Sequence, residues 1–304
     1  KVAADLAVKK NVTAILGASW SSHSIAVAKV AQSAGIPMIS ADSTNQRVTR
    51  IGDFIFRVCY TDPFQGQLMA HFAVTELQAK TASMLVDASS NYSTGLAKVF
   101  SENFKKNGGR IDKVVSYKYL QDNYRSEMQQ LKQMDSDIIF IPGHDESAAI
   151  LLEAMRTGIK SIPIGCDGWS TIKSFKKDDM KVTRGYYSTH WSEGIQTLQA
   201  QQFVKKYKKN GKLLSSEPLG YDAALLLADA MTRAKSFEPD RIKTALQQTE
   251  NFRGVTGNIS FDKFGDPLKS TAIIRILDGE AHYLRSITPE QLEISAPESM
   301  EVTD

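Results

Sequence analysis

The sequence predicts an α/β fold made of two doubly wound parallel-sheet lobes. Short apolar runs alternate with helical patterns in two successive series, which is the order of βα units. Polar loops of small residues follow the apolar runs, at the edge where parallel sheets bind small ligands. A length of 304 residues is enough for two lobes, each with its own core.

The first series opens the chain. Residues 2–10 are predicted to end a helix that leads into the first strand. Strands are then expected at residues 12–16, 36–40 and 54–58, and helices at 22–34 and 64–77. Asp62 and Pro63 predict how the second of these helices starts, with Asp62 as the N-cap and Pro63 as the first helical residue.

The second series is longer and ends differently. Its strands are expected at residues 82–86, 111–117, 138–141, 162–165 and 185–188, and its helices at 92–104, 124–134 and 146–156. Helices at 197–209, 218–235 and 240–248 follow, and then strands at 257–261, 271–277 and 281–284. Asp278 and Gly279 predict a tight hairpin turn between the last two strands. Residues 290–304 are expected to be a loose terminus.

Composition excludes several functional classes. The chain is 42% hydrophobic and 23% charged, as in soluble globular proteins and unlike disordered or fibrous ones. No apolar run approaches the roughly 20 residues of a membrane span. The net charge of +3 is small, and no basic stripe with interleaved aromatic residues indicates a nucleic-acid partner.

No enzyme signature is present. The chain contains no Gly-x-Ser-x-Gly elbow, no dinucleotide or phosphate-binding glycine loop and no set of residues with metal-ligand spacing. We therefore predict no catalytic residue, no metal and no cofactor. Cys59 and Cys166 are either free buried thiols or one long-range disulfide, and we favour free thiols.

Two polar loops are the best candidates for a site. One, residues 17–22, follows the strand at 12–16, and the other, residues 41–45, follows the strand at 36–40. The first loop runs into a helix N-terminus, where free N–H groups and the helix dipole favour an anion. The loops therefore predict a small ligand that carries a carboxylate.

An ordered set of motifs resembles a known family. Residues 17–24, followed by Ala34-Gly35-Ile36-Pro37-Met38-Ile39-Ser40, resemble the first-lobe signature of type I periplasmic ligand-binding proteins. The most similar group is the branched-chain amino acid (Leu/Ile/Val) binding proteins of ABC importers. Further pieces occur in the family's order: Phe56-Arg57 with Gln65-Gly66, Tyr92 with Gly95-Leu96-Ala97, residues 137–141, Ile164-Gly165-Cys166-Asp167-Gly168, Gly220-Tyr221-Asp222-Ala223-Ala224 and Gly257-Asn258-Ile259-Ser260-Phe261-Asp262.

The resemblance implies two lobes that are joined by three hinge crossings and close on a ligand. Lobe 1 would comprise residues 1–60 and 191–268, lobe 2 residues 61–190 and 269–288, and residues 289–304 a C-terminal tail. The family begins with a further strand and helix, which are absent before Lys1. We therefore expect the sequence to be a fragment of a longer chain, with lobe 1 incomplete at its N-terminus.

The resemblance also assigns roles in lobe 1. Ser21 and Ser22 match the loop whose hydroxyl and N–H groups take the ligand carboxylate, and the alternative is that one of them only caps the helix. Asp42, Ser43 and Thr44 lie in the second loop, where the family uses backbone groups and a threonine hydroxyl. Asp42 departs from the family's small residue, and it either helps to hold an ammonium group or points to water.

In lobe 2 the resemblance points to Tyr92 and Asp167. Tyr92 matches a tyrosine that covers the ligand, and its alternative role is packing at a helix start. Asp167 matches the acid that pairs with the ligand's α-ammonium, although aspartate is also a common turn residue. Trp20, Trp169, His144 and Tyr221 lie on or beside the same loops and are candidates to close over the ligand.

The predicted function is binding rather than chemistry. We expect an extracytoplasmic solute-binding protein, soluble or lipid-anchored, that delivers an amino acid or similar carboxylate to an ABC importer permease. A monomer without nucleic-acid partners is expected. Trp20 and Trp169 favour an aromatic or large apolar ligand side chain, and aromatic acids remain open. The alternative is the sensing ectodomain of a membrane receptor, and an enzyme on the same lobes is a third possibility.

Overall fold

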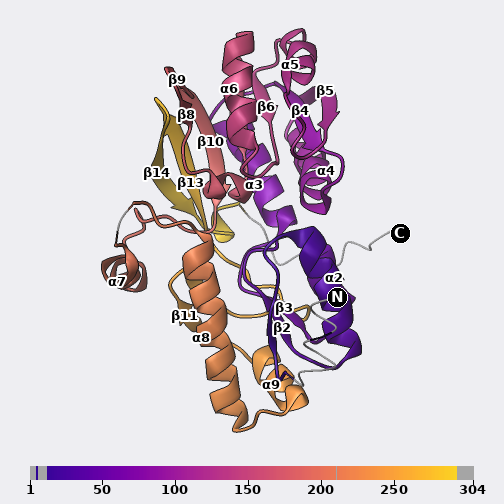
Figure 1. Ribbon diagram of the computed structural model, residues 1–304, viewed down its shortest axis with the longest axis vertical. Coiled ribbons are helices and arrows are strands. Elements are labelled where there is room, and N and C mark those ends of the chain that lie inside the picture. The colour runs from indigo at the N-terminus through magenta and orange to yellow at the C-terminus, as the bar shows by residue number, and fades with distance from the viewer. Residues whose placement is uncertain (1–4, 6–11, 210, 293–304) are drawn as a thin grey trace.

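The computed structural model describes residue 5 and residues 12–209 and 211–292. Most of the predicted helix end at 2–10, and the tail from residue 293, lie outside these residues. The described chain forms two α/β bodies that follow one another along the long axis of the molecule (Figure 1). One body is built on a three-stranded sheet and the other on a seven-stranded sheet, which confirms the two-lobed α/β fold.

The small sheet is parallel and has helices on both faces. Its order is β1 (Ile15–Leu16), β2 (Met38–Ser40) and β3 (Ile55–Arg57). Met38 and Ile55 pack on α2 (Ser21–Ser33), whereas Ile39 and Phe56 pack on the far side. That side is covered by α8 (Ser216–Ala234) and α9 (Pro239–Gln247). Successive side chains thus point to opposite faces of the sheet, as they do in a strand that is buried on both faces.

The large sheet has the order β14-β13-β10-β7-β6-β4-β5. Its parallel strands are β5 (Arg110–Tyr117), β4 (Thr81–Asp87), β6 (Ile138–Phe140), β7 (Ile162–Gly165) and β10 (Arg184–Thr189). Helices α3 (Asp62–Thr75) and α4 (Asn91–Lys106) cover one face, and α5 (Arg125–Lys132) and α6 (Ser147–Thr157) cover the other. Neighbouring strand residues divide between these faces: Ile138 and Phe140 join the first core and Ile139 the second.

The C-terminal strands extend the large sheet. β13 (Thr271–Leu277) pairs antiparallel with β10, and β14 (Glu280–Ile287) pairs antiparallel with β13. The predicted turn between them is confirmed, because Asp278 and Gly279 have φ of 51° and 77°, as a tight hairpin turn requires. The predicted strand at 257–261 belongs to neither large nor small sheet. It forms β12 (Gly257–Ile259), which pairs only with β11 (Phe252–Gly254).

Three smaller elements complete the described chain. They are the 3₁₀ helices η2 (Gln46–Ile51) and η3 (Asp167–Thr171), the hairpin of β8 (Lys176–Lys177) and β9 (Met180–Lys181), and the helix α7 (Leu198–Tyr207). A short 3₁₀ turn, η4 (Glu290–Leu292), ends it. No helix in the described part of the chain is long and apolar enough to cross a membrane.

The chain passes three times between the two bodies, after β3, after β10 and before β13. At the first passage α3 begins at Asp62, one residue earlier than predicted, with Thr61 at the N-cap position. Asp62 does not cap the helix because it is itself the first helical residue, and its Oδ1 accepts a hydrogen bond from Gln65 Nε2 (3.1 Å). Cys59 and Cys166 are free and buried, as predicted. The proposed lobe boundaries stay a prediction.

Arg57, at the end of β3, holds the loop after β2 in place through hydrogen bonds from the interior of the small-sheet body. Its side chain is fully buried and pairs with Asp266 through Nε (2.6 Å). The two remaining nitrogens donate to the carbonyl oxygens of Ser43 (2.5 Å) and Asn45 (2.9 Å). A buried guanidinium is stable only when paired and hydrogen-bonded, and these partners supply both.

Candidate ligand-binding site

The two loops of the small sheet are tied into one surface by serine hydroxyls. Ser43 Oγ lies 2.7 Å from both Ser24 Oγ and the carbonyl of Ser19. Ser21 Oγ accepts a hydrogen bond from Asn45 N (3.2 Å). Neither Ser21 nor Ser22 caps α2, because the N-cap position is Trp20 and no side chain caps the helix. The first-turn N–H groups of α2 therefore suit an anion.

In the second loop, the side chains of Thr44 and Asp42 each have a buried oxygen without a hydrogen-bond partner among the described residues. Thr44 is completely buried, and its hydroxyl has no hydrogen-bond partner in the described structure. Asp42 Oδ2 accepts from Ser19 Oγ (2.9 Å), whereas its buried Oδ1 has no partner. Burial raises the pKa of the Asp42 carboxyl to about 7, although the bond from Ser19 opposes this rise.

Tyr92 and Asp167 meet at the carboxyl edge of the large sheet. Tyr92 comes from the first turn of α4 and Asp167 from the start of η3, after β7. The Tyr92 hydroxyl donates to Asp167 Oδ1 (2.9 Å) and accepts from Gly168 N (3.0 Å). His190, which follows β10, contacts Asp167 Oδ2 through Nε2 (3.3 Å). Both carboxylate oxygens of Asp167 thus have a donor.

Asp167 is the ionised acid of this edge. Burial opposes its ionisation, but the hydrogen bond and charge of His190, together with hydrogen bonds from Gln65 and Tyr92, outweigh burial and hold the pKa of Asp167 below its ordinary value. Burial lowers the pKa of His190, whereas its hydrogen bond to Asp167 opposes this change. The site therefore offers a buried, ionised carboxylate that is held in place by His190 and Tyr92.

An aromatic stack joins the two bodies. Trp20, at the start of α2, stacks on His144 with ring centroids 4.7 Å apart, and His144 stacks on Tyr92 at 4.6 Å. Tyr119 meets Trp20 edge-on at 5.3 Å. Trp20 belongs to the small-sheet body, whereas the other three follow strands or begin helices of the large-sheet body. The structure therefore has the two loop edges closed on one another.

Polar contacts at Asn91 reinforce this closure. Asn45 Nδ2 donates to the Asn91 carbonyl (2.8 Å), and Ser22 Oγ accepts from Asn91 N and Nδ2 (both 3.4 Å). Ser22 therefore faces the opposite body, as a residue of a closing cleft would.

Most of the predicted site residues are brought together, but three have other roles. Trp169 is completely buried beneath η3, where its Nε1 donates to the Ile141 carbonyl (3.0 Å). Tyr221 packs against Phe203 and Tyr207 beside α7. The Ser43 hydroxyl is used to tie the two loops together. The structure therefore gives these three side chains packing or loop-bridging contacts, and their contact with a ligand stays a prediction.

Sequence reasoning missed several residues that the fold brings to this place. The rings of His190 and Tyr60 contact one another at a tilt, with centroids 3.8 Å apart, and both residues lie on crossing segments. Gln65 connects Asp62 to the Asp167 N–H, which lies 3.4 Å from Gln65 Oε1. His190 could have been found in the sequence only by its position directly after a predicted strand, at the sheet edge where ligands bind.

Several buried polar atoms near the two loop edges have no hydrogen-bond partner in the described structure, and they indicate what kind of ligand fits there. They are Asp42 Oδ1, Thr44 Oγ1, Asp62 Oδ2, Tyr60 Oη and His190 Nδ1. Leaving such groups unpaired costs about 1–3 kcal/mol each, so native proteins rarely do so without a reason. No cluster of described residues has the composition of a metal site. The arrangement suits a small polar ligand with groups of both signs.

Comparison with known proteins agrees with this geometry. A family model described as periplasmic binding protein matches residues 1–280. A Leu/Ile/Val-binding protein homolog of Brucella suis biovar 1 is 24% identical over 256 residues, which are 83% of this chain and 68% of the relative. The crystal structure of a leucine-binding protein of Thermotoga maritima is 30% identical with a TM-score of 0.87, covering 95% of this chain and 83% of that one.

A second solved structure is similar over the same extent. It is the isoleucine complex of a branched-chain amino acid transporter substrate-binding protein of Streptococcus pneumoniae, which is 25% identical with a TM-score of 0.82. The match covers 95% of this chain and 83% of the Streptococcus pneumoniae chain. Since the family model spans nearly all of the sequence, the chain belongs to the periplasmic binding protein family.

Proposed function

We propose that this chain captures an amino acid for an ABC importer. The observation that carries the proposal is the buried, ionised Asp167 on one body, opposite the α2 N-terminus and Thr44 on the other. An α-amino acid has an ammonium group for Asp167 and a carboxylate for the loop donors. Such a ligand would bridge both bodies, whereas a ligand without charged groups, or with a carboxylate alone, would not use both halves.

Closure on the ligand is the proposed mechanism. The open protein would offer Ser21, Ser22 and Thr44, and the bound carboxylate would then be covered as Tyr92 and Asp167 approach. The ligand shifts the open–closed equilibrium by its greater affinity for the closed form. The stack of Trp20 on His144 would add to the stability of that form.

The ligand side chain is proposed to be aliphatic. Relatives whose names and structures state leucine, isoleucine or valine binding support this choice. The argument for an aromatic ligand rested on Trp20 and Trp169, and Trp169 lies in the core. A thermal-shift screen of amino acids and aromatic acids tests the class, because a bound ligand raises the melting temperature.

The proposed partners follow from this role. They are the small-molecule ligand and the permease of an ABC importer, which the protein would meet outside the cytoplasm as a monomer. The named relatives, which include binding proteins of transporters, support this assignment over a receptor ectodomain. Size-exclusion chromatography with light scattering tests the monomer, and uptake of labelled leucine by membrane vesicles that contain the permease tests delivery.

Replacing Asp167 is the decisive test of the amino acid site. Asp167→Ala should lower affinity for the amino acid at least tenfold to a hundredfold, because a charge-assisted hydrogen bond contributes about 1.5–3 kcal/mol. Isothermal titration calorimetry measures the affinity. Asp167→Asn keeps the shape and should lose nearly as much, since the charge is what the ammonium requires.

The matched control is Asp179→Ala, which removes an exposed acid from the turn of the β8–β9 hairpin. It should bind like the unmodified protein. Unchanged affinity of the folded Asp167→Ala protein, checked by circular dichroism, would contradict the proposed role of Asp167.

A further inference from the structure

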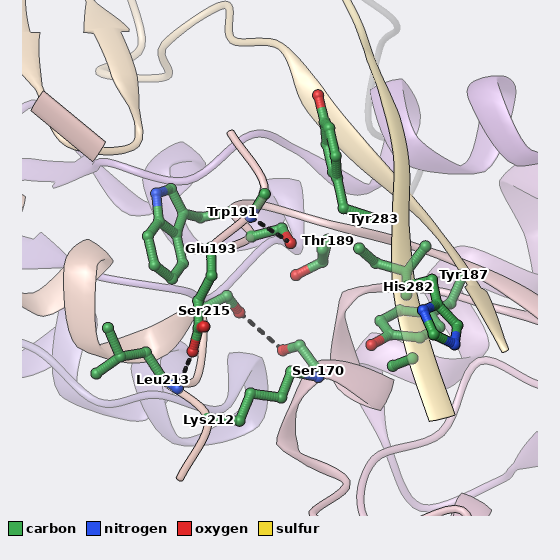
Figure 2. A pocket seen from close by; sticks show the side chains of 14 residues that line it. Ser170, Tyr187, Thr189, Trp191, Glu193, Lys212, Leu213, Ser215, His282 and Tyr283 are labelled. Carbon is green, nitrogen blue, oxygen red and sulfur yellow. Dashed lines mark hydrogen bonds between the residues drawn. The ribbon is translucent and has the colours of Figure 1, made fainter. Parts of the chain in front are cut away.

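A second pocket lies behind the candidate site. Its volume is about 310 Å³, and it is formed by β10, the segment after it, η3, β13, β14 and the connection between α7 and α8 (Figure 2). Its lining residues do not include Trp20, the two loops of the small sheet, Tyr92, His144 or Asp167. It is therefore a separate cavity.

The segment after β10 separates the two sites. Thr189 and Trp191 line the pocket, whereas His190 between them contacts Asp167. Side chains alternate between the two sides of an extended chain, so neighbours face opposite ways. The pocket and the candidate site thus lie back to back across residues 189–191.

The pocket is lined by polar groups that have no internal partner. Thr189 and Trp191 are each 2% exposed, and neither Thr189 Oγ1 nor Trp191 Nε1 has a hydrogen-bond partner in the described structure. Figure 2 shows the Thr189 hydroxyl directed into the space between the labelled side chains. Ser170 and Ser215 share one hydrogen bond across the pocket (2.8 Å), which leaves each hydroxyl further capacity.

Among the described residues, two acids lie near Lys212 at the pocket, and both form ion pairs with other lysines. Glu193 accepts from Leu213 N (2.6 Å) and pairs with Lys208 (2.5 Å), so both its oxygens are used. Glu280, the other acid close to Lys212, pairs with Lys176 (2.5 Å). Lys212 itself, exposed at the rim, has no ion-pair partner among the residues of the described structure.

A helix terminus adds to this positive potential. The 19-residue helix α8 begins at Ser216, next to the pocket residue Ser215, and no side chain caps it. The positive end of its dipole favours an anion in the same place as Lys212 does. The rest of the wall is apolar and aromatic, and is contributed by Tyr187, Leu213, Ile274, Ala281 and Tyr283.

We propose that this pocket binds a small monocarboxylate with an apolar body. Lys212 and the hydroxyl groups of Ser170, Ser215 and Thr189 receive the carboxylate, and the apolar wall receives the body. Lys212, which has no ion-pair partner within the described part of the chain, matches one negative charge. The site is independent of the amino acid site, because the two lie on opposite sides of residues 189–191 and share no lining residue.

Benzoate is the probe, and benzamide, which has the same shape without the charge, is its control. Benzoate should bind at least tenfold more tightly than benzamide in isothermal titration calorimetry. The indole N–H resonance of Trp191, identified by its loss in Trp191→Phe, should shift as benzoate is added. Equal affinities for the two compounds, or no benzoate binding, would overturn the proposal.

Variants place the probe. Lys212→Met should weaken benzoate binding roughly tenfold or more, because it removes a charge-assisted hydrogen bond. Lys209→Met, which removes an exposed cation outside the pocket, and Asp167→Asn should both leave it unchanged. Thr189→Val, of similar shape, should weaken it. A change of benzoate affinity in Asp167→Asn, in either direction, with Lys212→Met unchanged would place benzoate in the amino acid site and overturn the proposal.

Discussion

Three aspartates near the cleft differ in the partners that the fold gives them. Asp167 receives donors on both oxygens, whereas Asp42 and Asp62 each keep one buried oxygen without a partner. Burial raises the pKa of Asp62 to about 7, and the negative charge of Asp167 adds to the rise. Residues of one type, within one site, therefore have different protonation states because of their hydrogen bonds.

Asp62 should make the ligand-free protein less stable as pH rises. Its folded pKa of about 7 exceeds the unfolded value of 3.8. Between these two values the folded state holds a proton that the unfolded state has lost. The contribution to stability is therefore complete below about pH 4 and is lost as pH rises to about 7.

The variant Asp62→Asn removes this titration. Relative to the unmodified protein, it should gain roughly 2–3 kcal/mol in unfolding free energy between pH 5 and pH 8. Urea unfolding at both pH values measures the difference. Asp179→Asn, at an exposed position, should show no such change. A difference for Asp62→Asn that does not vary with pH would refute the assignment.

At the scale of the element, the period of hydrophobic residues was sufficient to predict the sheets and helices. The parallel strands and the C-terminal hairpin lie where the sequence predicts them, because buried strands and helix faces have distinct periods. Of the small β11–β12 hairpin only β12 was predicted, since the three-residue segment of β11 at Phe252 is too short to show a period.

The site was predictable only in part. Asp167 and Tyr92 were found by resemblance, and their mutual hydrogen bond follows from where two elements meet. Trp169 lies two residues after Asp167, and the tight turn of η3 directs it into the core. Sequence position does not distinguish these two outcomes. His190 was missed because its partner is contributed by a distant element.

Two helical glycines should respond oppositely to substitution. A Cβ on Gly220 of α8 would meet nothing within 4 Å, whereas one on Gly66 of α3 would lie 2.8 Å from Val99 Cγ1. Gly220→Ala should therefore stabilise the protein by about 0.5–1 kcal/mol through helix propensity. Gly66→Ala should destabilise it by about 1–3 kcal/mol, as overpacking does.

Thermal and urea unfolding of the two alanine variants measures this contrast. Each variant is the control for the other, because the substitution is identical and only the surroundings differ. A gain in stability for both would show that α3 and α4 separate easily at Gly66.

At the scale of the molecule, side chains of the small-sheet body hold it closed against the large-sheet body. Trp20 contributes ring contacts to His144 and Tyr119, and Asn45 and Ser22 add hydrogen bonds to Asn91. These residues begin helices or follow strands, so they move with the bodies that carry them. Side chains at the edges of the two sheets therefore stabilise the closed form.

Trp20→Ala should shift the protein towards its open form. Two aromatic contacts contribute about 0.5–1.5 kcal/mol each. Because the ligand then has to supply that closing energy, its apparent affinity should fall roughly fivefold to a hundredfold. Calorimetry measures the affinity, and small-angle X-ray scattering without ligand should show a larger radius of gyration.

His23→Ala is the control for Trp20→Ala. His23 stacks on Trp20 within the same helix, so it does not join the two bodies. Its removal should leave affinity and radius nearly unchanged. If the two variants behaved alike, the stack would stabilise α2 and would not favour closure.

The position of Arg57 has a consequence for the ligand itself. Arg57 draws the Ser43 carbonyl towards the interior of the small-sheet body. A trans peptide is planar, with its N–H opposite its C=O, so the Thr44 N–H points the other way. A cation buried beneath the loop thereby aims a backbone donor outward, beside the unpartnered Thr44 hydroxyl. The carboxylate of the proposed ligand would thus meet a polarity that is set by a positive charge it never touches.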